Sequence, residues 1–118
     1  MHSIPETFDP NIFIGKTLEM VSYNANQINL FFDSKISICM MGDFVLKSKW
    51  RHRTLHIFPV KKDFGILELL EDRIAKAFIY DERKILQLHF NRGKIITLLN
   101  HRMYESYIIT THEVQYII

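Results

Sequence analysis

Apolar and polar positions alternate most clearly in the second half of the chain. In residues 85–90 every second side chain is apolar, ending in Phe90, which is typical of a strand with one face buried. Residues 94–99 are apolar on nearly both faces, and Gly93 between the two runs supplies the left-handed conformation that closes a short hairpin with a bulge. With a strand that begins at Ile74, these runs predict a three-stranded antiparallel meander.

The first half of the chain shows the same pattern with less contrast. Its predicted strands are residues 17–23, residues 27–32 with Ile28, Leu30 and Phe32 on one face, and residues 35–41 with Ile36, Ile38 and Met40 on one face. Segments 14–40 and 70–98 therefore share one order of strands and turns, at an offset that drifts from 56 to 59 residues. We interpret this as a degenerate internal duplication, although two unrelated meanders with similar turns would give the same pattern.

The centre of the chain departs from this pattern. Residues 43–58 predict one exposed strand that ends at Pro59. After it, Asp63 is a suitable cap for a short amphipathic helix, because apolar residues recur at helical spacing from Phe64 to Leu70. The acidic residues on the predicted solvent face of this helix are Glu68, Glu71 and Asp72.

The two ends of the chain add short elements. Asp9 followed by Pro10 is typical of a helix cap and a first helical residue, which predicts one turn over residues 10–13. Residues 107–111 and 114–118 predict two further strands. Together the elements predict the α+β class: a predominantly antiparallel, curved, half-barrel-like sheet of two three-stranded meanders and the C-terminal strands, with one short central helix.

Composition narrows the class of protein. At 118 residues, with 47% hydrophobic residues and only 4 Gly and 3 Pro, the chain suits one domain, residues 1–118, with its own core. A net charge of +2 is too small to indicate nucleic-acid binding by itself. The single cysteine excludes an internal disulfide, residues 1–10 lack the apolar core of a signal peptide, and no apolar run approaches the ~20 residues of a membrane span. We therefore expect a cytoplasmic protein without membrane association.

Candidate catalytic and metal-binding residues are few. His52 and His56 have the spacing of two ligands on a helix, but in an extended segment they lie about 13 Å apart at ~3.3 Å per residue, so surface histidines are favoured. Cys39 lies between apolar residues in a predicted strand, which is typical of an inert thiol rather than a nucleophile. The sequence has no glycine-rich phosphate loop and no nucleophile elbow. We therefore expect no enzyme activity, no metal site and no cofactor.

Two further stretches have a structural and a functional interpretation. Glu105 beside Tyr104 is either a working acid or, as we favour, part of a corner in which both side chains bond to turn backbone. The second stretch is basic and contains Lys47, Lys49, Arg51 and Arg53. It indicates either a solvated strand edge, which we favour, or a nucleic-acid-binding strand with Trp50 as a stacking platform.

Four short motifs follow one another along the chain. They are Ile14-Gly15-Lys16-Thr17-Leu18, Leu69-Leu70-Glu71-Asp72-Arg73-Ile74, Phe90-Asn91-Arg92-Gly93 and Tyr104-Glu105-Ser106-Tyr107. In order and spacing they resemble a family of small bacterial proteins with a Leu-Gly-x-x-Val opening, a Leu-Leu-x-x-x-Val opening of the second half, a Phe-x-x-Gly hairpin and a Tyr-Glu-(Ala/Ser)-aromatic signature. Two positions depart from it: Glu71 stands where the family usually has glycine, and Tyr107 where it usually has tryptophan.

Families of this kind are often encoded beside polymorphic or contact-dependent growth-inhibition toxins. The resemblance implies a single immunity-like domain that binds a cognate toxin C-terminal domain, commonly a nuclease, in a 1:1 complex and blocks its active-site cleft without a reaction of its own.

Because a nuclease cleft is basic, acidic side chains suit such a contact best, and an aromatic residue is a suitable anchor. The residues expected to contact the toxin are Trp50, Glu68, Glu71, Asp72, Asp81 and Glu82. The other interpretation of these carboxylates is a solvated helix face. The alternative function is a nucleic-acid-binding module that uses the basic strand of residues 47–53.

Overall fold

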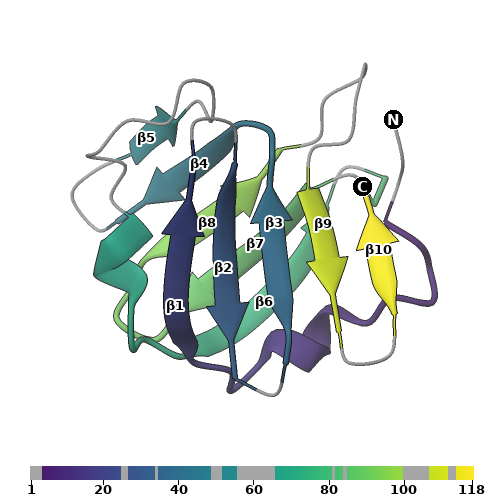
Figure 1. Ribbon diagram of the computed structural model, residues 1–118, viewed down its shortest axis with the longest axis horizontal. Helices are drawn as coiled ribbons and strands as arrows, with labels where there is room; N and C mark the ends of the chain where they lie inside the picture. Colours follow the sequence, from purple (N-terminus) through teal and green to yellow (C-terminus); the bar gives the residue numbers. More distant parts are fainter. Residues whose placement is uncertain are drawn as a thin grey trace.

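Two antiparallel sheets pack face to face in this protein. The computed structural model describes residues 4–24, 27–33, 35–48, 52–55, 66–80, 82–83, 85–99, 107–111 and 114–118, with residues 52–55 described by their backbone alone. In Figure 1 the strands of the first sheet run upright in front, and those of the second sheet run obliquely behind them. The molecule is therefore a β-sandwich.

Each sheet has five strands. The first has the order β1 (Leu18–Tyr23), β2 (Ile28–Phe32), β3 (Ser37–Met40), β9 (Tyr107–Thr110), β10 (Gln115–Ile117). The second has the order β5 (His52–Leu55), β4 (Phe44–Lys47), β8 (Ile95–Leu98), β7 (Ile85–Phe90), β6 (Ile74–Tyr80). Two short 3-10 helices, η1 (Pro10–Phe13) and η2 (Ile66–Leu69), precede β1 and β6.

The predicted α+β class is wrong, and so are the curved half-barrel and the central helix. Across the described residues the helical elements are the 3-10 turns η1 and η2, and neither sheet is curled or closed. Ile66 and Leu69 are both buried, and their spacing fits the three residues per turn of a 3-10 helix. Glu71 then adopts a positive φ of 68°, which a right-handed helix cannot continue. The two meanders exist, but they lie in different sheets.

Local turn chemistry follows the sequence more closely. The Asp9 carboxylate accepts a 2.9 Å hydrogen bond from the Asn11 amide at the start of η1, which confirms the predicted cap. Gly93 has a φ of 95° between β7 and β8, which confirms its left-handed conformation. The single exposed strand predicted over residues 43–58 is wrong, because β4 and β5 pair as a hairpin with Lys47 opposite His52.

The chain crosses between the sheets after each meander. The β4–β5 hairpin follows β3 along the chain, but β4 pairs with β8 in the other sheet. The β9–β10 hairpin follows β8, but β9 pairs with β3. Each sheet is therefore completed by a hairpin from the other half of the chain.

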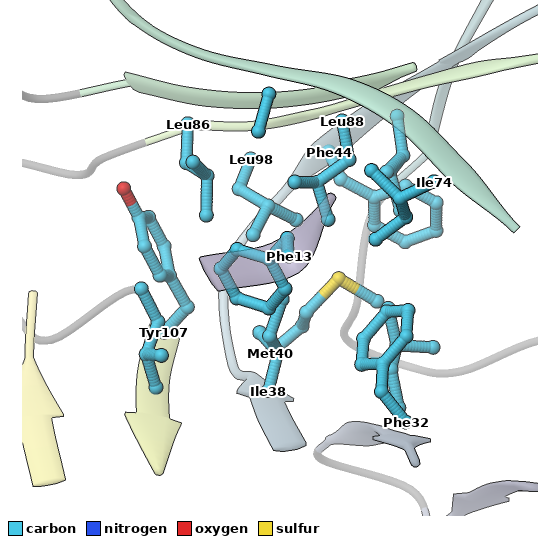
Figure 2. Packing of buried hydrophobic residues seen from close by; sticks show 14 of the residues in the cluster. Phe13, Phe32, Ile38, Met40, Phe44, Ile74, Leu86, Leu88, Leu98 and Tyr107 are labelled. Carbon is cyan, nitrogen blue, oxygen red and sulfur yellow. The ribbon is translucent and has the colours of Figure 1, made fainter. Parts of the chain in front are cut away.

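The core lies between the inner faces of the two sheets. Figure 2 shows Phe44, Leu86 and Leu88 of the second sheet facing Ile38 and Met40 of the first. These side chains point inward because they alternate with half-buried residues along each strand, as a period of two requires. Their packing fixes the register of both sheets.

Aromatic rings fill the part of this core beside η1. The Phe13 ring meets the Phe32 ring edge-on at 5.7 Å between centroids, and Phe8 meets Tyr116 in the same way at 5.0 Å. Tyr107, at the start of β9, is almost fully buried, and this burial raises the pKa of its hydroxyl. Strand β9 is thus anchored by a large ring at the point where it enters the first sheet.

The N-terminal segment is tied to the turn between β6 and β7. The Arg83 guanidinium donates hydrogen bonds to the carbonyl oxygens of Ile4 (2.9 Å), Pro5 (2.6 Å) and Phe8 (3.2 Å). The Ile4 amide donates in return to the Arg83 carbonyl at 2.6 Å. Residues far apart in sequence are therefore held together by charge-assisted bonds.

Glu71→Gly should raise the free energy of unfolding by about 0.5–1 kcal/mol. Left-handed backbone costs a residue other than glycine roughly 1–2 kcal/mol, and the greater freedom of glycine in the unfolded chain offsets part of this gain. Urea denaturation measures the change. As the control, Gly15→Ala at a φ of 84° should lower stability by a similar amount, although nothing lies within 4 Å of the added methyl group. Unchanged or reduced stability of Glu71→Gly would contradict this account.

Candidate functional site

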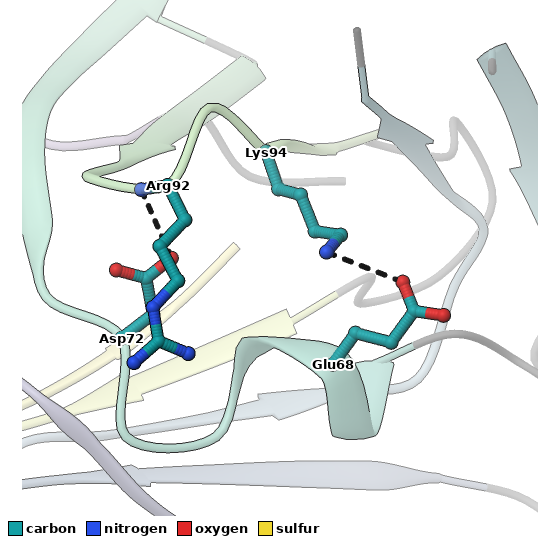
Figure 3. A network of polar contacts seen from close by, with 4 residues as sticks. All are labelled: Glu68, Asp72, Arg92 and Lys94. Carbon is teal, nitrogen blue, oxygen red and sulfur yellow. Dashed lines mark hydrogen bonds and ion pairs between the residues drawn. The ribbon is translucent and has the colours of Figure 1, made fainter. Parts of the chain in front are cut away.

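The acidic residues expected to contact a toxin do not form one patch. Glu68 on η2 is exposed and forms a 3.3 Å ion pair with the Lys94 ammonium, as drawn in Figure 3. Glu71 is exposed beside it, whereas Glu82 is exposed beyond the opposite end of β6. A seven-residue strand spans about 20 Å at ~3.3 Å per residue, so Glu71 and Glu82 are well separated. Trp50 and Asp81 lie outside the described residues.

Asp72 has a structural role. Its side chain was predicted to face water, but the residue is only 3% exposed. One carboxylate oxygen accepts a hydrogen bond from the Arg73 amide at 2.8 Å. The other accepts one from the Arg92 amide at 3.2 Å, which Figure 3 draws. Asp72 thus joins the start of β6 to the turn between β7 and β8, and both of its oxygens are occupied.

Asp72→Ala should lower the free energy of unfolding by about 2–4 kcal/mol, because two amides lose a charged acceptor and a buried group is removed. Glu68→Ala is the matched control and should change it by less than about 0.5 kcal/mol, since an exposed ion pair contributes little. Thermal and urea unfolding of both variants check the difference. A loss as small as that of Glu68→Ala would contradict the structural role of the Asp72 carboxylate.

A set of aromatic and polar side chains lies on the outer face of the second sheet, away from the core. We call it the aromatic face; it consists of Lys76, Phe78 and Tyr80 of β6, Gln87 and His89 of β7, and Thr97 of β8. These positions alternate with buried residues such as Ala77, Leu88 and Ile96, and cross-strand pairing places them on one side. Phe78 is 37% exposed and Tyr80 is 48% exposed.

The rings of the aromatic face touch one another. The centroids of Phe78 and Tyr80 lie 5.9 Å apart at an interplanar angle of 33°. The imidazole of His89 meets Phe78 at 5.1 Å and 80°, an edge-to-face contact across the two strands. Phe78 is therefore held from two sides although it is exposed to solvent.

A chain of hydrogen bonds fixes the polar members. Gln87 donates through Nε2 to Thr97 Oγ1 at 3.0 Å, and its Oε1 lies 2.7 Å from His89 Nε2. Because an amide oxygen only accepts, this arrangement assigns the imidazole proton to Nε2 of His89. Side chains on two adjacent strands, β7 and β8, are thus held in place by these bonds.

The described charges on this side of the sheet are basic. Lys76 pairs with His89, His89 with Ile95, and Ile95 with Lys47, which forms one row across four strands. No carboxylate occupies an outward position of β4, β6, β7 or β8 among the described residues. Partial burial and the positive charge of Lys76 lower the pKa of His89. Neutral His89 is therefore the favoured form.

Lys76→Met should raise the pKa of His89 toward its usual value of 6.5, which an NMR titration of the imidazole measures. Because the folded pKa lies below the unfolded one, the stability due to neutral His89 is complete above pH 6.5 and is lost as the pH falls below it. Lys35→Met, in the turn between β2 and β3 of the first sheet, is the control and should leave this pKa unchanged. A His89 pKa above 6.5 in the native protein would contradict this description.

Sequence reasoning missed most of the aromatic face. His89 points away from the face of Leu86, Leu88 and Phe90, as the alternation in residues 85–90 requires. The register shift between Ile74 and Lys76 breaks the alternation at the start of β6, so a strict period of two from Ile74 places Phe78 and Tyr80 on the inner face. Their spacing after the bulge, with apolar Ile79 between them, was the signal that could have found them.

The described residues give no support to a catalytic or metal centre. Cys39 is half-buried on β3, and burial raises the pKa of its thiol, which disfavours the reactive thiolate. In the described ranges no three histidine, cysteine or acidic side chains converge as a metal site, and no helix has the length and apolarity to cross a bilayer. His56, Tyr104 and Glu105 fall outside those ranges.

Comparisons of the chain with protein-family models, with curated proteins and with solved structures find no match. The resemblance to immunity proteins therefore stays a prediction from the four sequence motifs, and the aromatic face has to be interpreted from its own chemistry.

Proposed function

We propose that this protein binds another protein through the aromatic face and neutralises it, as an immunity protein neutralises a cognate toxin domain. The observation that carries the proposal is the exposed pair Phe78 and Tyr80 on a face whose polar groups are already held in place. The binding is stoichiometric and needs no reaction by this chain. The order of the four sequence motifs supports the same class of protein.

Aromatic residues suit this task for a physical reason. Phenylalanine and tyrosine offer a large contact area with few rotatable bonds, so little conformational entropy is lost on binding. The contacts among Phe78, Tyr80 and His89 restrict the rings further. Binding hot spots are rich in aromatic rings, and the contacts around them contribute little energy but exclude water. A stable complex would cover about 800 Å² on each partner, which requires neighbouring surface as well.

The positive charge of the aromatic face restricts which partner surfaces it can bind. Lys47 and Lys76 favour a neutral or acidic partner surface, because like charges across an interface are costly. If the partner is a nuclease toxin, the aromatic face contacts a surface beside its phosphate-binding cleft and blocks the cleft sterically. Glu68 and Glu71 remain available for a separate contact at the η2 end of the molecule.

Single-stranded nucleic acid is the second candidate ligand. Exposed rings flanked by lysines on an open sheet can stack bases and contact phosphates, and Lys47, Lys76 and Phe78 provide both. Nucleic-acid binding weakens steeply as salt rises, whereas burial of aromatic surface against a protein does not. The salt dependence of binding therefore distinguishes the two candidates.

The double variant Phe78→Ser, Tyr80→Ser should weaken binding to the proposed cognate toxin domain by roughly 30-fold or more. Loss of a hot spot costs about 2 kcal/mol or more, which corresponds to that factor. Calorimetry with a catalytically inactive toxin domain and rescue of growth on toxin expression measure the effect. Met20→Ser, at a position 52% exposed on the first sheet, is the matched control and should bind and protect normally.

Different outcomes reject different parts of the proposal. Normal binding by the double variant would remove the aromatic face from the interface. Failure of the native protein to bind and to protect would reject the immunity function. Salt-sensitive binding of single-stranded RNA or DNA, lost on Lys47→Ala with Lys76→Ala, would favour the second candidate.

A further inference from the structure

The two halves of the chain repeat one arrangement. In each half a 3-10 helix leads into a three-stranded meander, and the following hairpin leaves for the other sheet. The first unit runs from η1 to β5 and the second from η2 to β10, and Figure 1 shows each hairpin extending the opposite meander. We infer that the chain is two linked copies of one unit whose natural binding partner is a second copy of itself. This inference is independent of the proposed function.

Backbone hydrogen bonds between the two units occur in matching pairs. The Gly15 amide donates to the Ile74 carbonyl at 2.8 Å, and the Glu71 amide donates to the Leu18 carbonyl at the same distance. Gly15 and Glu71 occupy equivalent positions. Each is the second residue after its 3-10 helix, and each has a positive φ. The geometry of one junction is therefore reproduced at the other with different side chains.

A second matching pair crosses the same point. The Ile74 amide donates to the Lys16 carbonyl at 2.9 Å, and the Leu18 amide donates to the Asp72 carbonyl at 3.1 Å. Between them Thr17 and Arg73 form an isolated antiparallel bridge. Because a bridge between equivalent residues can occur only where a two-fold axis passes, this bridge marks the axis that relates the units.

The meanders agree in their irregular features too. The register shifts between Leu18 and Met20 in the first unit, and between Ile74 and Lys76 in the second. At the next turn the Phe32 amide donates to the Ile36 carbonyl, and the Phe90 amide donates to the Lys94 carbonyl, both at 2.8 Å. Equal strand order alone can arise by chance, but equal bulges and equal turns at equal places favour repetition of one unit.

Each unit contacts the other through its C-terminal hairpin, β4–β5 in the first unit and β9–β10 in the second. Phe44 pairs with Leu98 at the start of β4, and Tyr107 pairs with Met40 at the start of β9. Phe44 and Tyr107 are equivalent, and both are among the largest fully buried side chains. A unit without its partner would expose the inner face of its meander and the unpaired edge of β3 or β8.

The two units end in equivalent ways, so one connecting segment suits the end of either unit. Leu55 pairs with Phe44 at the end of the first unit, and Ile118 exchanges backbone hydrogen bonds with Tyr107 at the end of the second. Residues 56–65 lead from Leu55 to η2, so the same segment placed after Ile118 would have the same gap to span. The number of connecting residues therefore does not prevent a chain of two identical units.

The decisive experiment is a tandem chain in which residues 56–118 occur twice in succession. We expect it to unfold cooperatively as a monomer and to give a single set of amide NMR signals, apart from those near the chain ends, because a two-fold axis makes both copies equivalent. A folded tandem with two complete sets of signals would overturn the inference.

Mismatched core side chains could prevent the tandem from folding, so a circular permutant of the native sequence supplies a second test. In it Ile118 is joined to Met1, and the chain is opened between Val60 and Lys61. We expect a melting temperature within a few degrees of the native protein. The control permutant, opened between Arg92 and Gly93 inside a meander, should melt far lower. Failure of both the tandem and the first permutant, or equal melting of the two permutants, would overturn the inference.

Discussion

Pairing between the two halves of the chain is the constraint on which the rest of this structure depends. Without β9 the first sheet ends at β3, and without β4 the second ends at β8. The inner faces of both meanders are apolar, so neither is stable in water until the opposite sheet covers it. The core shown in Figure 2 and the burial of the Tyr107 ring both follow from this mutual completion.

The sequence was informative where one face of a strand is buried and misleading where two local structures share a pattern. Alternation located β2, β3 and β7, because a period of two has no other common explanation. The apolar spacing around Ile66 and Leu69 fits both an α-helix and a 3-10 turn, and the left-handed Glu71 decides against the longer helix. Which sheet receives each hairpin depends on contacts between distant residues, so no local pattern could reveal it.

The candidate site was less predictable than the fold. The acidic residues form a group in sequence, but Asp72 is drawn into the core by two backbone amides and β6 separates Glu71 from Glu82. The aromatic face is assembled from three strands, and its hydrogen bonds join Gln87 to His89 and to Thr97 across the sheet. A surface of this kind has no motif in sequence, because cross-strand register brings its members together.

The hydrogen bonds between Arg83 and residues 4–8 form late in synthesis, because the two partners are far apart in sequence. Residues 4–8 are synthesised before Arg83, whose guanidinium and carbonyl hold them. Each sheet also needs strands from both halves, since β8 borders β4 and β9 borders β3. The second sheet therefore stays incomplete until β8 has been synthesised and the first until β9 follows, and the edges of β3 and β4 remain unpaired in the nascent chain until then.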